Sequence, residues 1–493
     1  MANLAESKRV AVVGGGIAGL AVAIRLRLQG HEVVLFEANA YLGGKIAEHR
    51  EDGFRFDRGP SVLTMPQYLD ELFELAGEHP RNHFNYHRLD PIFQYMFEDG
   101  TVLHTHADTE ALIAEFAAKT KVKAEDLRTF FQRSKEKLEL TDEVFLQRSL
   151  HQWKNYLDWP TLRGILQFSK VEAFTTMAKA NARLLKDEKV VSILNQYASY
   201  NGSDPFSAPA TLNLISHYEL TLGAYYPEGG MRTIISALEG LAERVGVKVQ
   251  LNTCVERLLV KDGKCNGLKT NGEERLFDAV VSNADVFKTY QQLIPEVKKP
   301  LSALNQPKSS SVIVFYWGMD RTFPELKLHN MFMSGNQRLE YEQLFDGKDI
   351  PDDPTVYLYI SSKQNPSDAP AGKENWFAMI TVPHNTGQDW DALVAVARER
   401  VLAKLSRNLK TELSGMIACE TILDPVKVEQ ETGSAFGAVF GNSSNGIFAA
   451  FLRHPNFSGK VENLFFCGGS VHPGSSIPLC LLSAKITANI FSR

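Results

Sequence analysis

The N-terminal part of the chain alternates short apolar runs with a stretch of helix-forming residues. Residues 9–13 and 32–36 are apolar and rich in valine, a pattern that is typical of buried parallel strands. Residues 20–26 lie between these runs and favour a helix that continues toward Gly30. This order predicts a β–α–β unit and a parallel sheet.

The pattern of apolar and polar positions indicates further elements along the chain. Residues 107–195 have a helical pattern with polar breaks, whereas residues 365–372 have the composition of a loop. We expect helices at 233–245 and 479–490, and strands at 247–251, 255–260, 277–281, 311–317, 355–360 and 377–382.

The turn between the first strand and the helix carries glycines at positions 14, 16 and 19. Gly14 permits a tight turn, Gly16 lets the backbone approach a pyrophosphate, and Gly19 lets the helix pack against the strand. The helix N-terminus offers N–H groups to phosphates, and Glu37, after the second strand, can accept hydrogen bonds from a ribose. A purely structural glycine turn is the alternative, but strand, helix and acid together predict a dinucleotide site.

A second pair of glycines follows at positions 43 and 44, with Lys45 next to it and Gly59-Pro60-Ser61 further on. Glycines let another backbone segment come close to the cofactor, and Lys45 can reach a phosphate as a point charge. A dehydrogenase that binds only NAD has no need of this second loop, whereas an extended flavin dinucleotide has. A hairpin turn with a solvated lysine is the alternative.

The C-terminal end has the same order of strand, glycine turn and helix. An apolar run that begins at residue 463 ends on Gly468 and Gly469, and residues 472–478 precede the predicted helix. Pro478 suits a first helical turn, where an N–H group has no partner within the helix. The helix N-terminus can direct its dipole at a flavin ring and favour the negative charge that arrives with a hydride. An ordinary strand-to-helix turn is the alternative.

The composition excludes several classes of protein. The 493 residues suggest about two or three domains, and 44% hydrophobic with 23% charged residues fits a globular chain. A formal charge of −5 argues against nucleic acid as a partner. Five cysteines without a CxxC pair predict neither a disulfide framework nor a zinc site, so a reducing, cytoplasmic compartment is expected. The sequence has no signal-peptide pattern and no apolar stretch of about 18 residues, so no membrane-spanning helix is expected.

These motifs resemble those of the bacterial-type phytoene desaturases, a family of carotenoid desaturases that share a fold with amine oxidases and GDP-dissociation inhibitors. The segments that carry the resemblance are 12–19, 36–45, 54–64, 225–231, 281–285 and 466–488. Within that family the chain is most similar to the hydroxycarotenoid 3,4-desaturase branch, on segments 197–203, 315–318, 328–330 and 451–457. One departure is Lys45, where many flavoproteins of this fold have arginine.

The resemblance implies a fold class and a division of the chain. The fold is α/β, a Rossmann-like FAD-binding domain of the amine oxidase/GDP-dissociation-inhibitor type with an inserted α+β substrate domain. Residues 1–75, 228–290 and 460–493 would form the discontinuous FAD-binding domain, and residues 76–227 and 291–459 the substrate-binding and membrane-docking region. The resemblance also implies non-covalent FAD and a membrane-dissolved carotenoid as substrate, and it leaves the electron acceptor open.

The resemblance also implies the cofactor contacts. Gly14, Gly16 and Gly19 would hold the pyrophosphate and Glu37 the ribose. Val255 would meet the adenine through its backbone, and Asn283 falls in the turn that returns the chain to the cofactor. The residues expected along the phosphate and the flavin ring are Lys45, Gly59, Pro60, Ser61, Val62, Gly469, Ser470, Ile477, Pro478 and Leu479. No metal ligand is expected.

A carotenoid substrate lies in a bilayer, so some surface of the enzyme must contact a membrane. Residues 148–189 have eight basic and four acidic residues, and between them lie Trp153, Tyr156, Trp159, Phe168 and Phe174. Basic and aromatic residues together suit the headgroup interface. A solvated basic helix face with core aromatics is the alternative. Given the resemblance, we expect peripheral association with the inner face of the cell membrane.

The expected activity is an FAD-dependent desaturation of a carotenoid, specifically of a 1-hydroxycarotenoid at the 3,4 position, with phytoene desaturation as an alternative. FAD takes a hydride, and the protein positions the substrate and excludes water. His217, Glu219, His384 and His454 are candidate bases, but each fits a structural role better, so no catalytic residue is assigned. An amine oxidase lacks support because its covalent-flavin cysteine pattern is not evident. The intact glycine motifs argue against a flavin-free binding protein like the GDP-dissociation inhibitors.

Overall fold

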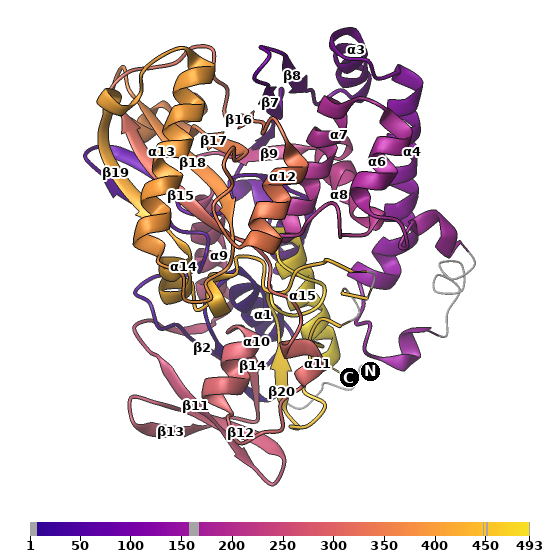
Figure 1. Cartoon of the computed structure of the whole chain (residues 1–493). Helices are drawn as coiled ribbons and strands as arrows, with labels where there is room; N and C mark the ends of the chain where they lie inside the picture. The colour runs from indigo at the N-terminus through magenta and orange to yellow at the C-terminus, as the bar shows by residue number, and fades with distance from the viewer. Residues whose placement is uncertain (1–6, 157–166, 447, 450–451, 493) are drawn as a thin grey trace.

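The computed structural model describes residues 7–156, 167–446, 448–449 and 452–492 (Figure 1). Three distant parts of the chain meet in one parallel sheet of order β10–β2–β1–β14–β20. Its strands are β1 (Arg9–Val13), β2 (Glu32–Phe36), β10 (Lys248–Gln250), β14 (Ala279–Ser282) and β20 (Leu464–Phe466). The predicted strands at 9–13 and 32–36 are confirmed with the same bounds, and the predicted strand at 247–251 is shorter.

Strand β1 lies in the middle of this sheet, parallel to β2 on one side and to β14 on the other. Val12 is the register partner of both Leu35 and Val281. Because the strand order reverses at β1, a crevice is expected at the carboxyl ends of β1 and β14. The turns that begin at Gly14 and Asn283 both leave the sheet at this place.

Helices cover one face of the parallel sheet, and a small antiparallel sheet covers the other. On the first face, α1 (Ile17–Leu28), α9 (Arg232–Val245) and α15 (Ile477–Phe491) form one apolar core with the strands. On the second face lie β11 (Val255–Lys261), β12 (Lys264–Thr270) and β13 (Glu273–Leu276). The predicted helices at 233–245 and 479–490 are confirmed, and the second begins slightly earlier, at Ile477.

The remaining strands form mainly one large sheet, drawn in the upper part of Figure 1. Its order is β19–β15–β18–β17–β16–β7–β8, antiparallel except between β16 and β7. Helix α13 (Trp390–Leu409) packs on one face, and the other face is lined with aromatic side chains. The strands are β7 (Phe93–Met96), β8 (Val102–Thr105), β15 (Ser311–Met319), β16 (His329–Phe332), β17 (Val356–Tyr359), β18 (Glu374–Val382) and β19 (Ile417–Leu423).

The predicted helical region contains α3 (Thr109–Lys119), α4 (Ala124–Thr141), α6 (Met177–Leu185) and α7 (Glu188–Asn195), whereas residues 157–166 lie outside the described part. Within the predicted loop 365–372, residues Pro366–Asp368 form one 3₁₀ turn.

Two small sheets complete the strands. One pairs β3 (Glu48–Glu51) with β4 (Phe54–Asp57), and the other pairs β9 (Ala224–Pro227) with β5 (Leu63–Thr64) and β6 (Tyr86–Arg88). Shorter helices are α2 (Gln67–Leu75), α8 (Leu214–Ser216), α10 (Val286–Lys288), α11 (Leu301–Leu304), α12 (Gln337–Glu342) and α14 (Pro425–Thr432). Among the described residues, no helix combines the length and apolar character needed to cross a membrane.

Candidate FAD site

Two positions of the turn after β1, Gly14 and Gly19, require glycine for reasons of geometry. Gly14 has φ +95°, and a Cβ atom on Gly19 would lie 2.0 Å from the carbonyl oxygen of Gly14. Helix α1 begins after Gly16 without a side-chain cap and without an acidic residue in its first turn. The first N–H groups of α1 therefore have no side-chain partner, which is the arrangement that binds phosphate at a helix N-terminus.

The second glycine pair lies directly against this turn. The N–H group of Gly43 donates to the carbonyl oxygen of Gly15 at 2.9 Å. A Cβ atom on Gly44 would lie 3.3 Å from the Cα atom of Gly16, and both Gly43 and Gly44 have positive φ. Two loops that are separated in the sequence thus form one backbone surface at the carboxyl end of β1.

Glu37 is buried at the end of β2, with 7% of its surface exposed. Its Oε2 atom accepts a hydrogen bond from the N–H of Gly15 at 2.7 Å, and its Oε1 atom accepts one from the N–H of Asn39 at 2.8 Å. A carboxylate has further lone pairs, so both oxygens can still accept hydrogen bonds from a ligand. The N–H of Thr253 donates to the Glu37 carbonyl, which brings the buried Val255 to the same end of the sheet.

Asn283 stabilises the glycine turn through hydrogen bonds. Its side-chain Nδ2 donates to the Gly14 carbonyl at 3.1 Å, and its backbone N–H donates to the Val13 carbonyl at 2.8 Å. A Cβ atom on Gly468 would lie 2.5 Å from Asn283 Oδ1, so the C-terminal glycine loop packs on the same side chain. The sequence places Asn283 near the cofactor, and the structure adds that it links the N-terminal and C-terminal loops.

The C-terminal loop ends in a capped helix. The hydroxyl of Ser476 accepts a hydrogen bond from the N–H of Leu479 at 3.3 Å, and Pro478 occupies the first turn of α15. A Cβ atom on Gly469 would lie 2.7 Å from Ser475 Oγ, which explains the glycine at that position. Ile477 is buried and Leu479 is partly exposed.

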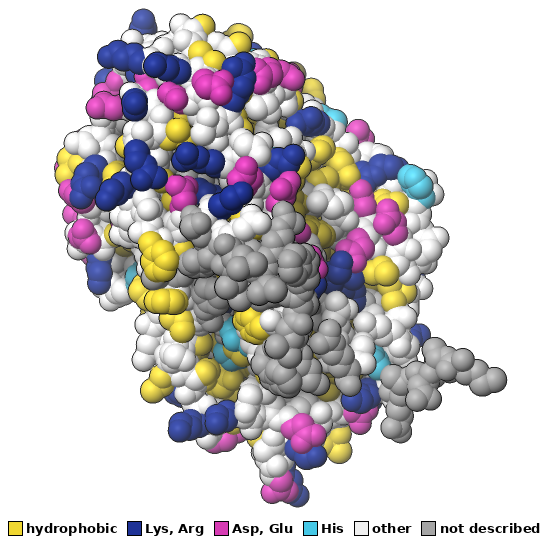
Figure 2. All heavy atoms as spheres, turned by 90° about the vertical axis from the view of Figure 1, so that its right-hand side faces the viewer, with side chains coloured by type: hydrophobic (Ala, Val, Ile, Leu, Met, Phe, Trp, Pro, Cys, Tyr) yellow, Lys and Arg dark blue, Asp and Glu magenta, His cyan; other side chains and the backbone are white. Residues whose placement is uncertain are grey.

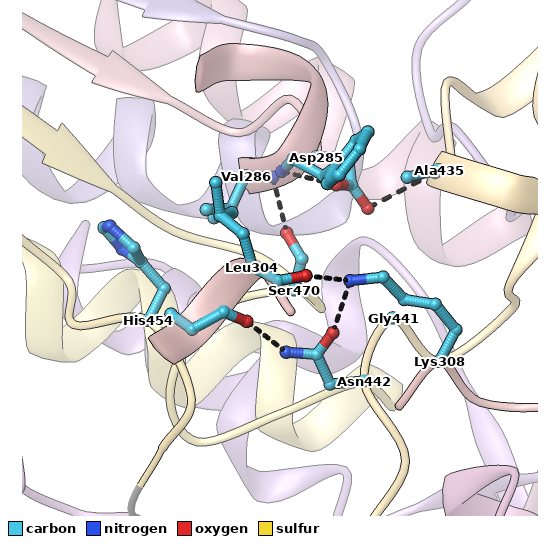
Figure 3. Close-up of a pocket in the computed structure, with 11 residues that line it drawn as sticks. Asp285, Val286, Leu304, Lys308, Ala435, Gly441, Asn442, His454 and Ser470 are labelled. Carbon is cyan, nitrogen blue, oxygen red and sulfur yellow. Dashed lines mark hydrogen bonds between the residues drawn. The ribbon is translucent and has the colours of Figure 1, made fainter. Parts of the chain in front are cut away.

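A small cavity lies beside this loop, between Ser470, Asp285, Lys308 and Asn442 (Figure 3). The hydroxyl of Ser470 accepts from the N–H of Val286 at 3.0 Å, and Lys308 Nζ donates to Asn442 Oδ1 at 2.8 Å. The cavity volume is about 10 Å³, which is room for about one water molecule.

Lys45 and the segment after Gly59 form another wall of the candidate FAD site. Lys45 Nζ donates to the carbonyl oxygen of Val439 at 2.5 Å, and burial lowers the pKa of its ammonium group. A Cβ atom on Gly59 would lie 1.9 Å from the Lys45 carbonyl oxygen, so only glycine fits there. Pro60 and Val62 are partly exposed, whereas Ser61 is buried. The phosphate contact of Lys45 stays a prediction.

A buried ion network links two segments of the family resemblance, and the sequence analysis missed it. Arg55 on β4 forms ion pairs with Asp57 at 2.6 Å and with Asp368 at 3.1 Å. Asp57 also accepts from the N–H of Met231 at 3.1 Å, and a Cβ atom on Gly230 would lie 2.5 Å from Arg55 Nη2. The sequence signal that could have indicated this network is the pair of opposite charges, Arg55 and Asp57, on a short strand whose other residues are aromatic.

A polar cluster lies within the aromatic face of the large sheet. Tyr197 donates to Glu219 Oε1 at 2.7 Å, and Tyr200 donates to Oε2 of the same carboxyl group. Burial raises the pKa of Glu219 to about 7, although these phenols oppose the shift. The hydroxyl of Tyr357 lies 2.6 Å from Ser61 Oγ and 2.7 Å from His329 Nδ1. This cluster therefore continues to the wall formed by Ser61.

The three candidate histidines have other surroundings. His454 donates from Nδ1 to the Pro455 carbonyl and contacts the Tyr290 hydroxyl through Nε2, and burial lowers its pKa to about 4. Burial also lowers the pKa values of His217 and His384. All three favour the neutral form, and the packing of His454 beside Phe466 indicates a structural role.

Comparison with known proteins assigns the chain to a family. Residues 17–490 match the family described as flavin containing amine oxidoreductase. The chain belongs to this family of flavin enzymes. It is 42% identical, over 98% of its length and 99% of the relative, to a 1-hydroxycarotenoid 3,4-desaturase from Flavobacterium sp. (strain P99-3). It is 33% identical, over 98% of each chain, to a 4,4'-diapolycopene oxygenase from Methylomonas sp..

Solved structures of oxidoreductases share the fold. A putrescine oxidase variant covers 99% of each chain with a TM-score of 0.66 and 16% identity. An oxidoreductase from Methanosarcina mazei covers 98% of this chain with a TM-score of 0.64 and 15% identity. These likenesses confirm the predicted α/β fold of the amine oxidase type.

The cofactor of this flavin oxidoreductase is FAD, and the residues present fit it. The N-terminus of α1 has no side-chain cap, which suits a diphosphate. The Glu37 carboxylate retains acceptor capacity at the end of the adjacent strand, where a ribose diol is expected. The match to the flavin family confirms the expectation of FAD rather than NAD alone.

The predicted membrane-docking stretch, residues 148–189, begins beside the C-terminal loop. His472 Nε2 donates to the carbonyl oxygen of Arg148 at 2.8 Å. Arg148, Arg183 and Lys189 each form an ion pair with a nearby acid, whereas Lys179 and Lys186 are exposed and form no ion pair within the described part of the chain. Trp159 and Arg163 lie outside the described residues.

Proposed function

We propose that this flavin oxidoreductase is a carotenoid desaturase that introduces a C=C bond into a 1-hydroxycarotenoid at the 3,4 position. The observation that carries the proposal is the 42% identity to a relative of that activity over nearly the whole of both chains. The hydroxycarotenoid branch expected from segments such as 197–203 agrees with it. Phytoene desaturation is the alternative within the same reaction class.

Several of the proposed cofactor contacts lie at the carboxyl ends of β1 and β2. The N–H groups at the start of α1, with Gly14, Gly16 and Gly19, hold the pyrophosphate, and Glu37 accepts hydrogen bonds from the ribose. The adenine lies beside the backbone of Val255. The flavin ring lies between the segment Gly59–Val62 and the start of α15, and FAD there supplies the hydride acceptor.

The rest of the chain positions the substrate and excludes water. The aromatic face of the large sheet consists mainly of buried rings, among them Phe93, Tyr316, Tyr357 and Phe377, and it also contains the polar cluster described above. An extended polyene gains apolar burial on such a surface, and its reacting bond stays away from water. We propose that residues 1–75, 228–290 and 460–493 bind FAD, and that residues 76–227 and 291–459 bind the substrate.

We also propose that residues 148–189 dock on a membrane. Phe174 and Tyr156 in this stretch are 77% and 40% exposed, and Phe448 and Leu452, which flank other undescribed residues, are 64% and 44% exposed. Figure 2 shows hydrophobic side chains around the residues drawn in grey, below a band rich in Lys and Arg. Apolar side chains beside basic ones suit an anionic lipid surface.

A substrate panel tests the proposed activity. The holoenzyme in liposomes is given a 1-hydroxycarotenoid, phytoene, a carotenoid without a hydroxyl group and putrescine, and the products are separated and weighed by mass spectrometry. The proposal predicts that the hydroxylated carotenoid is converted fastest and loses two hydrogen atoms. Faster conversion of phytoene would favour the alternative desaturase, an added oxygen atom would indicate an oxygenase, and turnover of putrescine alone would overturn the proposal.

A charge reversal tests the docking surface. The double variant Lys179→Glu/Lys186→Glu should bind anionic vesicles more weakly, most visibly at low salt, because each basic residue near the surface contributes about 1 kcal/mol. The matched control is Lys261→Glu/Lys410→Glu, since all four lysines are exposed and both Lys186 and Lys410 have positive φ. Equal vesicle binding by the two variants at every salt concentration would show that this stretch is not the docking surface.

A further inference from the structure

Arg453 is a buried cation with an unused hydrogen-bond donor. Only 4% of its surface is exposed. Its Nη2 group donates to the Asn442 carbonyl at 3.1 Å and lies 3.5 Å from Ser444 Oγ. Its Nη1 group is buried and has no hydrogen-bond partner among the described residues. Buried guanidinium groups normally use their fork of donors fully, so the free Nη1 group indicates a missing acceptor.

The charge of Arg453 is also unbalanced. No carboxylate among the described residues lies within 4.0 Å of it, whereas the buried Arg55 has three such partners. Burial lowers the Arg453 pKa to about 10. An unpaired buried charge costs several kcal/mol, so a protein keeps one chiefly where a ligand supplies the compensating group.

Arg453 lies against the C-terminal loop at the start of α15. A Cβ atom on Gly474 would lie 3.4 Å from the guanidinium carbon of Arg453 and 3.5 Å from Leu479 Cδ1. Leu479 is in the first turn of α15, where the helix dipole is positive. The guanidinium group of Arg453 and the first turn of α15 therefore lie on either side of Gly474. An electron-rich ligand near both would interact favourably with each positive pole.

We propose that Arg453 is a flavin-binding residue whose Nη1 group donates to an acceptor atom of the isoalloxazine ring and stabilises the negative charge that arrives with a hydride. The proposal rests on the proposed placement of the ring at α15. An uncharged substrate hydroxyl can accept the same hydrogen bond, but it does not balance the buried charge. The ring accepts the hydrogen bond when it is oxidised and also balances the charge once it is reduced.

Sulfite binding tests the proposal without substrate. Sulfite adds to oxidised flavins and leaves a negative charge on the ring, so its affinity reports a nearby cation. In the holoenzyme, Arg453→Met should raise the sulfite Kd about tenfold or more, since an adjacent charge shifts such equilibria by at least that factor. The reduction potential, measured anaerobically with a reference dye, should fall. Arg453→Lys keeps the charge and should stay closer to the parent.

The matched control is Arg25→Met, which removes another buried arginine, one that is 8% exposed and paired with Glu71. Its sulfite Kd should equal that of the parent. If Arg453→Met does not retain flavin, the Arg453→Lys and Arg453→Gln variants are compared with each other. Equal sulfite affinity in that pair, or in Arg453→Met and the parent, would overturn the proposal.

Substrate kinetics distinguish the two possible acceptors, the flavin ring and the substrate hydroxyl. Unchanged sulfite affinity in Arg453→Met, together with a raised KM only for hydroxylated carotenoids, would assign the donor to the substrate hydroxyl and overturn the flavin contact. A chain that binds sulfite as expected but desaturates no carotenoid would contradict the proposed function and leave the role of Arg453 standing.

Discussion

Replacing Glu37 by glutamine tests the ribose contact with little change of shape. The carboxylate accepts hydrogen bonds from Gly15 and Asn39 at 2.7 and 2.8 Å. The amide oxygen of glutamine can accept one of these hydrogen bonds, but its NH₂ group then faces the other N–H donor. The glutamine side chain also offers fewer acceptor sites to the ribose. A hydrogen bond to a charged acceptor contributes about 1.5–3 kcal/mol, so the FAD Kd should rise about 10- to 150-fold.

The assay is a titration of the flavin-free protein with FAD, followed by flavin fluorescence. Glu32→Gln is the matched control, because Glu32 lies at the opposite end of the same strand, is exposed and pairs with Lys248. It should leave the FAD Kd unchanged. If Glu37→Gln binds FAD as tightly as the control while its thermal midpoint falls, Glu37 only stabilises the glycine turn and does not bind the ribose.

Three further predictions concern the cofactor turn and the buried charges. Gly16→Val should lose FAD and keep its fold, because its Cβ approaches only Asn283 Nδ2, at 3.0 Å, whereas Gly19→Val should also lower the thermal midpoint of the flavin-free protein. Burial raises the folded-state pKa of Glu219 to about 7 from 4.5, so its contribution to stability falls as pH rises between these values. Glu219→Gln should therefore reduce the decline of the thermal midpoint over that range. Arg55→Met leaves two carboxylates buried and should cost about 3–5 kcal/mol of unfolding free energy in urea; a loss below about 1 kcal/mol would show that the network is not stabilising.

The N-terminal dinucleotide motif was predictable because its signals are local. Valine-rich runs at 9–13 and 32–36 fix two strands, and the stereochemistry of Gly14 and Gly19 fixes the turn between them. The helix at 479–490 was predictable for the same reason. A short sequence window contains the whole physical cause in each case.

Other features depend on contacts between distant residues. Strands β7 and β16 pair although more than two hundred residues separate them, and neither has a long alternating pattern. Arg55 meets Asp368 only after folding, and Asn283 reaches the Gly14 carbonyl from another part of the chain. The free Nη1 group of Arg453 has no sequence signal at all, since it is defined by which acceptors are absent around it in the described part of the chain.

A single anaerobic turnover tests the central claim most directly. The purified holoenzyme in liposomes is mixed with a 1-hydroxycarotenoid in the absence of any electron acceptor, and the flavin absorbance and the carotenoid mass are followed together. The account predicts that the flavin is bleached while the carotenoid loses two hydrogen atoms and its absorption shifts to longer wavelength. A flavin that stays oxidised with every carotenoid but is bleached by an amine such as putrescine would contradict it.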